Sequence, residues 1–492
     1  QQNTLAGTNA GDSFDGTNAI NNTLIGYNAG TAITTGDDNT ALGRNAYDAG
    51  TTGVRNTAIG SGALSETTSG GNNTAVGYSA LNQNTSGGTN VAVGQNALQY
   101  NTTASNNTAV GFGSLNANTT GTRNVAVGYN CLDANTTASY NTAVGGFALT
   151  NNTTGASNVA IGDNALDQNT TANNNTGVGY YALQSNTTGG SNTAVGAIAL
   201  DANQTGGNNN AFGYGALSAS TVSDNNAFGA FALHSNTTGT NNTGVGHRVM
   251  ISNTTGGYNV AVGAYALDAN TTADANVAVG NAALSANTTG DSNVALGANA
   301  LDANTTANYN VAIGADALTA NTTGTINTAV GSNTLAANTT GNYNVAVGGY
   351  ALDAVTTGTS NVAVGTSALT VNTASNNTAV GHETLGANTT GPSNVAVGFN
   401  ALYSNTTAEG NHAFGTWSLY SNTTGAHNVG VGRSTLYNNT TGSNNVSVGR
   451  NALSSNTTAS NNIAVGYQAL NANTTANSAV AIGYQALLAN TT

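Results

Sequence analysis

The sequence is dominated by a motif that recurs every 17 residues. A glycine that follows a small residue and an aliphatic residue returns at this interval from Gly26 to Gly483, and the interval shortens to 16 only before Gly229 and Gly381. The unit reads Asn-[Thr/Val]-Ala-Val-Gly-x-x-Ala-Leu-x-Ala-Asn-Thr-Thr-[Gly/Ala]-x-x, and we number its positions 1 to 17, so that residues 90–106 form one copy. Short repeats of this kind bury their apolar face by stacking on the neighbouring copy.

The residue types within the unit favour β-structure over helix. Helical repeats need about 33 residues or more for each unit, and Gly, Asn and Thr are poor helix formers. Positions 1 to 4 predict a short strand, and Gly at position 5 predicts a sharp bend. Ala-Leu at positions 8 and 9 predicts a second short apolar strand, and Asn-Thr-Thr at positions 12 to 14 predicts a turn. Each copy is therefore expected to form one coil with two short strands and two bends.

Stacked coils of this kind pair each strand with its copy in the next coil, in parallel and in register, at a spacing of about 4.8 Å. The predicted fold is all-β: an elongated rod formed by a parallel β-solenoid, of the β-roll or β-helix type, with about 28 coils of 17 residues. Residues 22–492 are assigned to this repeat domain. Residues 1–21 have irregular spacing and are assigned to an N-terminal coil or assembly segment.

The interior of so narrow a coil is expected to hold few side chains. Val at position 4 and Leu at position 9 are predicted to point inward, which gives in three consecutive coils the core residues Val93, Leu98, Val110, Leu115, Val127 and Leu132. Position 3 is almost always Ala or Gly, which indicates close packing against a neighbouring strand or against another subunit. Asn at positions 1 and 12 is expected to form ladders in which each side-chain amide bonds to its copy one coil away.

The composition excludes several classes of function. Charged residues make up 5% of the chain, against about 25% in an average globular protein. The net charge is −13 with six Arg and no Lys, so the clustered cations that nucleic-acid binding requires are missing. No apolar run is long enough to span a bilayer, and we expect no membrane insertion. Asp recurs at position 10 of alternate coils, which either separates like charges or reflects duplication of a coil pair, at Asp133, Asp167 and Asp201.

Catalytic and metal sites are not expected. Cys131 is the only cysteine, so no intramolecular disulfide can form, and its position is normally Ala, which indicates a small buried residue. The five His residues are dispersed without zinc-ligand spacing. A repeat this uniform offers no unique cleft, and we therefore predict a protein that is not an enzyme and has no cofactor.

The Asn-Thr-Thr segment allows three interpretations. Asn-x-Thr is the acceptor sequence for N-glycosylation, and at position 12 the candidates include Asn101, Asn118, Asn135, Asn169, Asn186, Asn236, Asn270, Asn304, Asn405 and Asn473. The same residues also make a good turn, and we favour this second interpretation because a repeat multiplies any motif it contains. The two Thr ranks also suggest an ice-binding face, although adjacent residues of an extended segment point to opposite sides.

Aromatic residues gather just after the glycine of position 5. Examples are Tyr129, Phe399 and Trp417. Exposed rings in these places could bind sugars or a neighbouring filament, and the alternative that we favour is packing over the bend or an interface between chains.

Both ends of the sequence are close to the phase of the repeat. The segment Asn490, Thr491 and Thr492 stops at position 14, and Asn3, Thr4 and Leu5 resemble positions 1 to 3. We expect these residues to stack subunits head to tail into an open filament. The alternative is that the chain is a fragment of a longer protein.

Motifs such as Asn124-Val125-Ala126-Val127-Gly128 and Asn158-Val159-Ala160-Ile161-Gly162 resemble the head repeats of YadA-like trimeric autotransporter adhesins. Similar repeats occur in phage tail-fibre-like proteins. The resemblance covers nearly the whole chain, although the coil here is longer than that of the family. It implies a left-handed parallel β-roll, a homotrimer and an adhesive or structural role at the cell surface.

The function expected from these observations is that of an extracellular structural fibre subunit, secreted or on the cell surface, which assembles with copies of itself and adheres to surfaces. Its partners are then other copies, in a head-to-tail filament or a homotrimer, together with surface glycans or a host receptor. The alternatives are the head of a trimeric adhesin, a phage tail fibre and an ice-binding solenoid.

Overall fold

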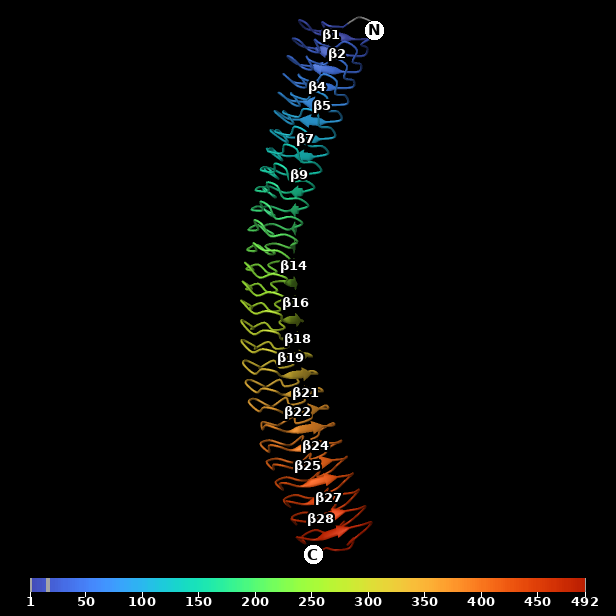
Figure 1. The fold of residues 1–492 in the computed structure, drawn as a ribbon, viewed down its shortest axis with the longest axis vertical. Coiled ribbons are helices and arrows are strands. Elements are labelled where there is room, and N and C mark those ends of the chain that lie inside the picture. Colours follow the sequence, from blue (N-terminus) through green and yellow to red (C-terminus); the bar gives the residue numbers. More distant parts are fainter. Residues whose placement is uncertain (1, 15–17, 492) are drawn as a thin grey trace. The chain divides into compact units, whose positions relative to one another are not determined.

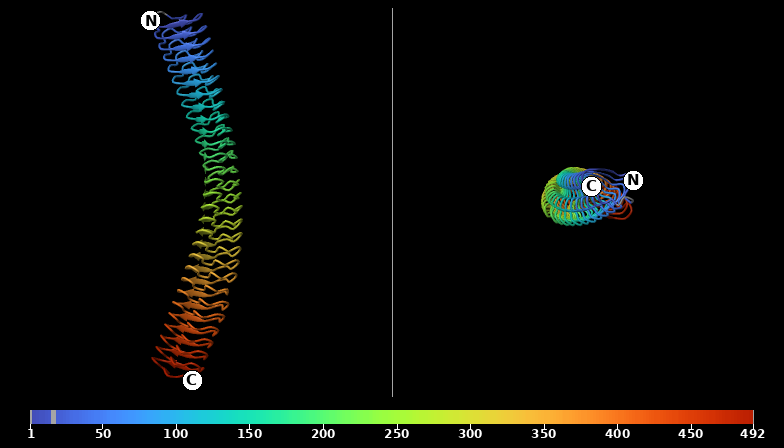
Figure 2. Two further views of the ribbon diagram at one scale, coloured as in Figure 1. Left: turned by 180° about the vertical axis from the view of Figure 1, so that it is seen from behind. Right: turned by 90° about the horizontal axis from the view of Figure 1, so that it is seen from above.

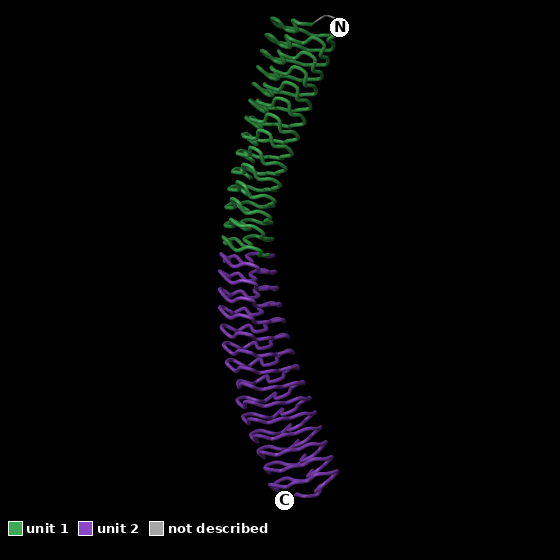
Figure 3. The backbone as a smooth tube through the Cα atoms, viewed as in Figure 1, with its two compact units in different colours: residues 1–243 green, residues 244–492 purple. Residues whose placement is uncertain are grey.

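The computed structural model describes residues 2–14 and 18–491 of the chain. Within these ranges every regular element is a β-strand and none is a helix (Figure 1). The chain divides into two compact units, residues 1–243 and residues 244–492 (Figure 3). In each unit the backbone winds through one coil for every copy of the repeat, and the fold is the parallel β-solenoid predicted from the sequence.

Every strand in the described ranges has three residues and occupies positions 2 to 4 of its repeat. In the first unit the strands are β1 (Thr4–Ala6), β2 (Thr23–Ile25), β3 (Thr40–Leu42), β4 (Thr57–Ile59), β5 (Thr74–Val76), β6 (Val91–Val93), β7 (Thr108–Val110), β8 (Val125–Val127), β9 (Thr142–Val144), β10 (Val159–Ile161), β11 (Thr176–Val178), β12 (Thr193–Val195), β13 (Asn210–Phe212) and β14 (Asn226–Phe228). Strand β15 (Thr243–Val245) lies at the boundary, and the second unit continues with β16 (Val260–Val262), β17 (Val277–Val279), β18 (Val294–Leu296), β19 (Val311–Ile313), β20 (Thr328–Val330), β21 (Val345–Val347), β22 (Val362–Val364), β23 (Thr378–Val380), β24 (Val395–Val397), β25 (His412–Phe414), β26 (Val429–Val431), β27 (Val446–Val448), β28 (Ile463–Val465) and β29 (Val480–Ile482).

Consecutive strands pair in parallel, residue for residue, so that each repeat position forms a rank along its unit. In the first unit Val125 of β8 lies beside Thr142 of β9, and in the second unit Val277 of β17 lies beside Val294 of β18. Figure 2 shows, within each unit, each coil lying over the one before it. The in-register pairing follows from the constant repeat length, because a coil of fixed length returns the chain to the same point one strand spacing along.

The predicted N-terminal segment begins with a coil of the same sheet. Thr4 of β1 pairs with Thr23 of β2, and the pairing continues in register to Ala6 and Ile25. The step between these two strands is 19 residues, and the additional length lies in the connection, of which residues 15–17 fall outside the described ranges.

The prediction of a second strand at positions 8 and 9 was wrong. This part of the coil is a series of turns, in which the N–H of Ala97 donates to the carbonyl of Gly94 and the N–H of Asn101 donates to that of Leu98. Leu98 has a φ of 52°, in the left-handed region that bulky residues rarely occupy. Its backbone N–H still bonds to the next coil, at 2.9 Å from the carbonyl oxygen of Ser114. The turns replace a strand because Leu at position 9 reaches the core only from this conformation.

The prediction for the core was correct for the leucines and wrong for the valines. Leu98, Leu115 and Leu132 are fully buried, whereas the valines at position 4 are only partly buried and lie on the outer face, at Val93, Val110 and Val127. Successive residues of a strand point to opposite faces, and position 3, which is Ala in nearly every coil, is the strand position that faces the narrow interior. Ala92, Ala109 and Ala126 are accordingly the fully buried strand residues.

Gly at position 5 permits the coils to approach closely. Gly348 has a φ of 125°, and a Cβ placed on it would lie 2.7 Å from the carbonyl carbon of Gly365 in the next coil. Its neighbour Gly349 has ordinary backbone geometry, and a Cβ there would meet nothing closer than the carbonyl oxygen of Ser332 at 3.7 Å. Two adjacent glycines therefore differ sharply in their tolerance of a side chain.

We predict that Gly348→Ala destabilises the protein by about 3 kcal/mol, because the substitution imposes both backbone strain and a steric clash. Gly349→Ala is the matched control and should change stability by less than about 1 kcal/mol. Guanidinium unfolding followed by far-ultraviolet circular dichroism measures both. Equal effects of the two substitutions would contradict this account of position 5.

Candidate functional site

The interior of each coil contains two ranks of Asn side chains that join it to its neighbours. At position 1 the backbone N–H of Asn124 donates to Oδ1 of Asn107 in the preceding coil, at 2.9 Å. Nδ2 of Asn124 donates to the carbonyl oxygen of Ala138, also at 2.9 Å. The ladder expected at position 1 is therefore present, with a backbone group as the donor between coils.

The rank at position 12 has the amide-to-amide form that was predicted. Nδ2 of Asn118 lies 2.9 Å from Oδ1 of Asn101 in the preceding coil and 2.9 Å from the carbonyl oxygen of Gly121 at position 15. Both Asn side chains are fully buried. A buried amide is stable only when its polar atoms are paired, and here the pairing runs from coil to coil.

The burial of position 12 contradicts glycosylation of the folded chain. The candidate side chains are all fully buried, at Asn101, Asn118, Asn135, Asn169, Asn186, Asn236, Asn270, Asn304, Asn405 and Asn473. An N-linked glycan would be attached to the Nδ2 atom, which in Asn118 and its equivalents donates the hydrogen bonds of the ladder. The interpretation of Asn-Thr-Thr as a turn sequence is the one that this geometry supports.

From Asn84 to Asn490 two substitutions interrupt the position 12 rank, and each leaves an unpaired oxygen. Ser220 is too short to reach the preceding coil, and Oδ1 of Asn203 there has no hydrogen-bond partner. Val355 has no donor, and Oδ1 of Asn338 in the preceding coil is likewise unpaired. A buried acceptor without a donor costs about 1–3 kcal/mol, so these two coils are the weak points of the ladder.

The two Thr ranks differ in their surroundings. Oγ1 of Thr102 at position 13 donates to the carbonyl oxygen of Thr119 in the next coil, at 3.1 Å, whereas Thr103 at position 14 is exposed. Position 13 therefore contributes to stacking, and only one of the two ranks presents free hydroxyl groups to water. A face with two outward Thr separated by one residue, as ice binding requires, is not formed at this corner.

The outer face of the sheet is largely apolar along the second unit, whereas in the first unit position 2 is Thr or Asn in every described strand except β6, β8 and β10. Positions 2 and 4 point outward from every strand, and in the second unit Val260, Val262, Leu296, Val345 and Val347 are 37–43% exposed. Among the described strands, the one ionisable residue at these two positions is His412. Because the strands are in register, the side chains of positions 2 and 4 form one surface along each unit, which we call the outer strand face. Among the described strands of the second unit, Thr328, Thr378 and His412 are the residues that interrupt its apolar character. We did not predict the outer strand face from the sequence. The small residue at position 3, between larger residues at positions 2 and 4, could have indicated that position 3 faces inward and its neighbours face outward.

In the first unit the outer strand face also contains stacked aromatic rings. Phe212 of β13 and Phe228 of β14 lie with their ring centroids 5.0 Å apart and their planes 9° apart. They replace Val at position 4 in two adjacent coils, and both remain more than one-third exposed. Position 4 therefore stays apolar in these two coils, while position 2 is polar, with Nδ2 of Asn210 donating to Oδ1 of Asn226 at 2.8 Å.

Carboxylates at position 10 are partly buried beside the turns. Burial raises the pKa of Asp133 and of Asp353 above the usual value. Burial is also the largest cause of the raised pKa of Asp268, and the charge of Asp302, two coils away, raises it further. Backbone hydrogen bonds and the charge of Arg248 act in the opposite direction and lower the pKa of Asp268.

The residues predicted to join subunits lie in the first and last coils. Asn3 continues the position 1 ladder, since its Oδ1 accepts the backbone N–H of Asn22 at 2.7 Å. Thr4 and Leu5 of β1 are exposed. At the other end, Nδ2 of Asn490 is 3.4 Å from Oδ1 of Asn473, and the carbonyl of Thr491 accepts a bond from Thr474. Thr492 lies outside the described residues.

No protein-family model and no curated protein matches this chain. The described part of the chain contains no helix long and apolar enough to cross a membrane. It also contains no group of three or more His, Cys, Asp or Glu residues that could hold a metal ion. The nearest approach of an imidazole to a carboxylate in these ranges is between His427 and Glu409, at 3.8 Å, and both side chains are exposed.

We predict that Val355→Asn stabilises the protein by about 1–2 kcal/mol, because the new amide can donate to Oδ1 of Asn338 and restore the rank. Val371→Asn places the same side chain at an exposed position 11 and should have little effect. Guanidinium unfolding of both variants tests this. A loss of stability in the first variant would mean that the apolar contacts of Val355 outweigh the hydrogen bond.

Cys131 is fully buried and its Sγ donates to the carbonyl oxygen of Ala143 at 3.1 Å. Burial raises the pKa of the thiol from 9.0 to about 12. Because the folded state favours the neutral thiol, this group contributes stability that is complete below pH 9.0 and is lost as the pH rises toward 12.

We therefore predict that Cys131 does not react with Ellman's reagent at pH 8 until the chain is unfolded, because thiolate is the reactive form. The double variant Cys131→Ala and Thr137→Cys moves the thiol to an exposed position of the same coil and should react rapidly without denaturant. Absorbance of the released thionitrobenzoate measures both rates. Rapid reaction of the native protein would contradict the burial of this coil.

Proposed function

We propose that this chain is an extracellular structural fibre subunit that associates with copies of itself through the outer strand face and has a role in surface adhesion. The solenoid fold of the coils is compatible with a structural repeat protein. The observation that carries the rest is the largely apolar surface that positions 2 and 4 form along the second unit. Its extracellular placement is supported by the resemblance of the strand motif to surface adhesins.

The stacking of the coils suits a mechanical role. Backbone groups, the two Asn ranks and the Thr of position 13 all bond from one coil to the next. These bonds are made by neutral groups, so they depend little on salt or on the redox state. A fibre subunit built in this way keeps its shape without charge pairs, disulfides or a thick core.

The outer strand face fits a second copy of the same chain. Monomeric proteins rarely leave contiguous apolar patches larger than a few hundred Å² exposed, and in the second unit this face has Val or Ile at position 2 of most strands and an apolar residue at position 4 of every strand. It carries almost no charge, so two copies can meet without burying an unpaired ion. Every copy presents the same ranks of apolar side chains, so a closed symmetric assembly can cover this face on each of its subunits.

Lateral association of this kind favours the trimeric adhesin head among the alternatives. A homotrimer would cover one face on each of three copies, whereas head-to-tail stacking uses the coil ends and leaves the outer strand face in water. The two arrangements are compatible, because they use different surfaces. We place lateral association first, since the exposed valines have no other partner in the described part of the chain.

We predict that the triple variant Val262→Glu, Leu296→Glu and Val347→Glu weakens self-association at least tenfold, because burying the three carboxylates against a second copy is unfavourable. The control variant carries Thr272→Glu, Thr306→Glu and Thr357→Glu, which adds the same charges to the exposed position 14 of the same coils. Sedimentation velocity over a range of concentrations measures the assembly state. A monomeric wild-type protein, or equal association of the two variants, would refute lateral assembly through this face.

A further inference from the structure

Three tyrosines at position 10 of consecutive coils form a stack in the second unit. The ring centroids of Tyr403 and Tyr420 are 5.5 Å apart, and those of Tyr420 and Tyr437 are 5.2 Å apart. The planes differ by 9° and 7°. The rings are therefore spaced like the coils. Each ring face within the stack packs against the ring of the adjacent coil.

The stack ends where position 10 becomes small. Gly386 precedes Tyr403 in the rank and Ser454 follows Tyr437, so each terminal ring has one face without a neighbouring ring. A groove is present beside each of these faces, one lined by Gly386 and Tyr403 and the other by Tyr437 and Ser454. The first groove also contains the carboxylate of Glu383, whereas none of the side chains that line the second carries a charge at neutral pH.

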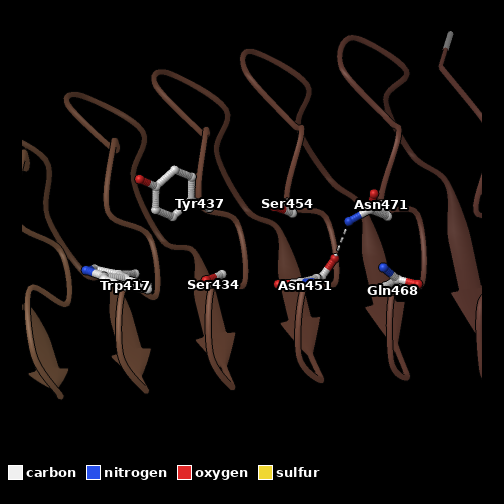
Figure 4. Close-up of a pocket in the computed structure, with 7 residues that line it drawn as sticks. All are labelled: Trp417, Ser434, Tyr437, Asn451, Ser454, Gln468 and Asn471. Atoms are coloured by element: carbon white, nitrogen blue, oxygen red, sulfur yellow. Dashed lines mark hydrogen bonds between the residues drawn. The ribbon is translucent and has the colours of Figure 1, made fainter.

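The groove beside Tyr437 runs along two ranks of turn residues (Figure 4). One rank, at position 7, contains Trp417, Ser434, Asn451 and Gln468, and the other, at position 10, continues from Tyr437 to Ser454 and Asn471. The groove volume is about 390 Å³, within the range of about 300–1,000 Å³ that is usual for small-molecule sites.

Both walls of the groove are held in place by side-chain contacts. Trp417 lies between the ring of Phe399, at a centroid distance of 6.2 Å, and the guanidinium of Arg433, at 5.1 Å. Nδ2 of Asn471 donates to the carbonyl oxygen of Asn451 at 2.9 Å. An ordered site loses less entropy when a ligand binds.

We propose that this groove binds a neutral oligosaccharide, with one pyranose ring stacked on the open face of Tyr437. The C–H face of a pyranose is apolar and fits an aromatic ring, while its rim of hydroxyl groups needs donors and acceptors in the same plane. Three side-chain amides and two hydroxyls supply them here. A flat apolar ligand would leave these polar groups unpaired, which is unfavourable, and a charged ligand would find no lining side chain of opposite charge.

A neutral oligosaccharide would be the ligand for the surface adhesion proposed above, and the inference rests on that proposed adhesive role. The groove lies at turn positions 7 and 10 and does not use the outer strand face. Saccharide binding and lateral association are therefore separate properties of the chain and can fail separately.

The test uses the single Trp of the chain, which lines the groove. Purified protein is titrated with cellohexaose and with chitohexaose, and Trp417 fluorescence is recorded. We expect a saturable change with at least one of these probes. Tyr437→Ser should weaken binding by about fivefold or more through loss of the stacking ring, and Ser454 at the same position of the next coil indicates that the coil accepts this residue.

The matched control is Tyr350→Ser, which removes an exposed ring elsewhere in the second unit and should leave the titration unchanged. The triple Glu variant of the outer strand face should bind the saccharide as the wild type does, whatever its assembly state. The proposal is overturned if neither saccharide gives a saturable change, or if Tyr437→Ser, with an unchanged circular dichroism spectrum, binds as tightly as the wild type.

Discussion

The fold depends on hydrogen bonds that buried amides make from one coil to the next. Each coil is too narrow for a thick apolar core, and its interior consists mainly of Ala, Leu and the two Asn ranks. The amide of Asn118 makes its bond between coils because another Asn occupies the same repeat position in the preceding coil. This pairing explains why the repeat length is so constant, since a coil of another length must still bring its Asn back into the rank.

The sequence was sufficient to predict the winding, the parallel register, the Leu core and the Asn ladders, because each follows from the period and from elementary pairing rules. It misled us about Val127 and about positions 8 and 9. Both errors have one cause, which is the width of the coil. A wider coil would take Val inside and continue Leu132 as a strand, but the narrow one takes Ala126 inside and turns Leu132 inward through a left-handed φ of 54°.

The candidate binding surfaces were less predictable than the fold. The repeat identifies which residues share a rank, but not which ranks face water. The outer strand face can be recognised only in the three-dimensional structure. The sequence shows Tyr403, Tyr420 and Tyr437 at one repeat position, and a stack could have been inferred from this. The groove beyond Tyr437 could not, because it also needs Trp417 and Asn471, whose ranks approach each other only through the turns of the coil.

The direction of the Asn ladders gives each unit an electrical polarity without any formal charge. In both ranks the Oδ1 atoms accept from the following coil, as Asn101 does from Asn118 and Asn107 from Asn124. The side-chain carbonyl dipoles are therefore aligned along the stacking axis, with their oxygens toward the C-terminal side. Aligned dipoles add up, as they do in an α-helix. A charged group that approaches along the stacking axis therefore meets a different electrostatic potential at the two ends of a row of neutral amides.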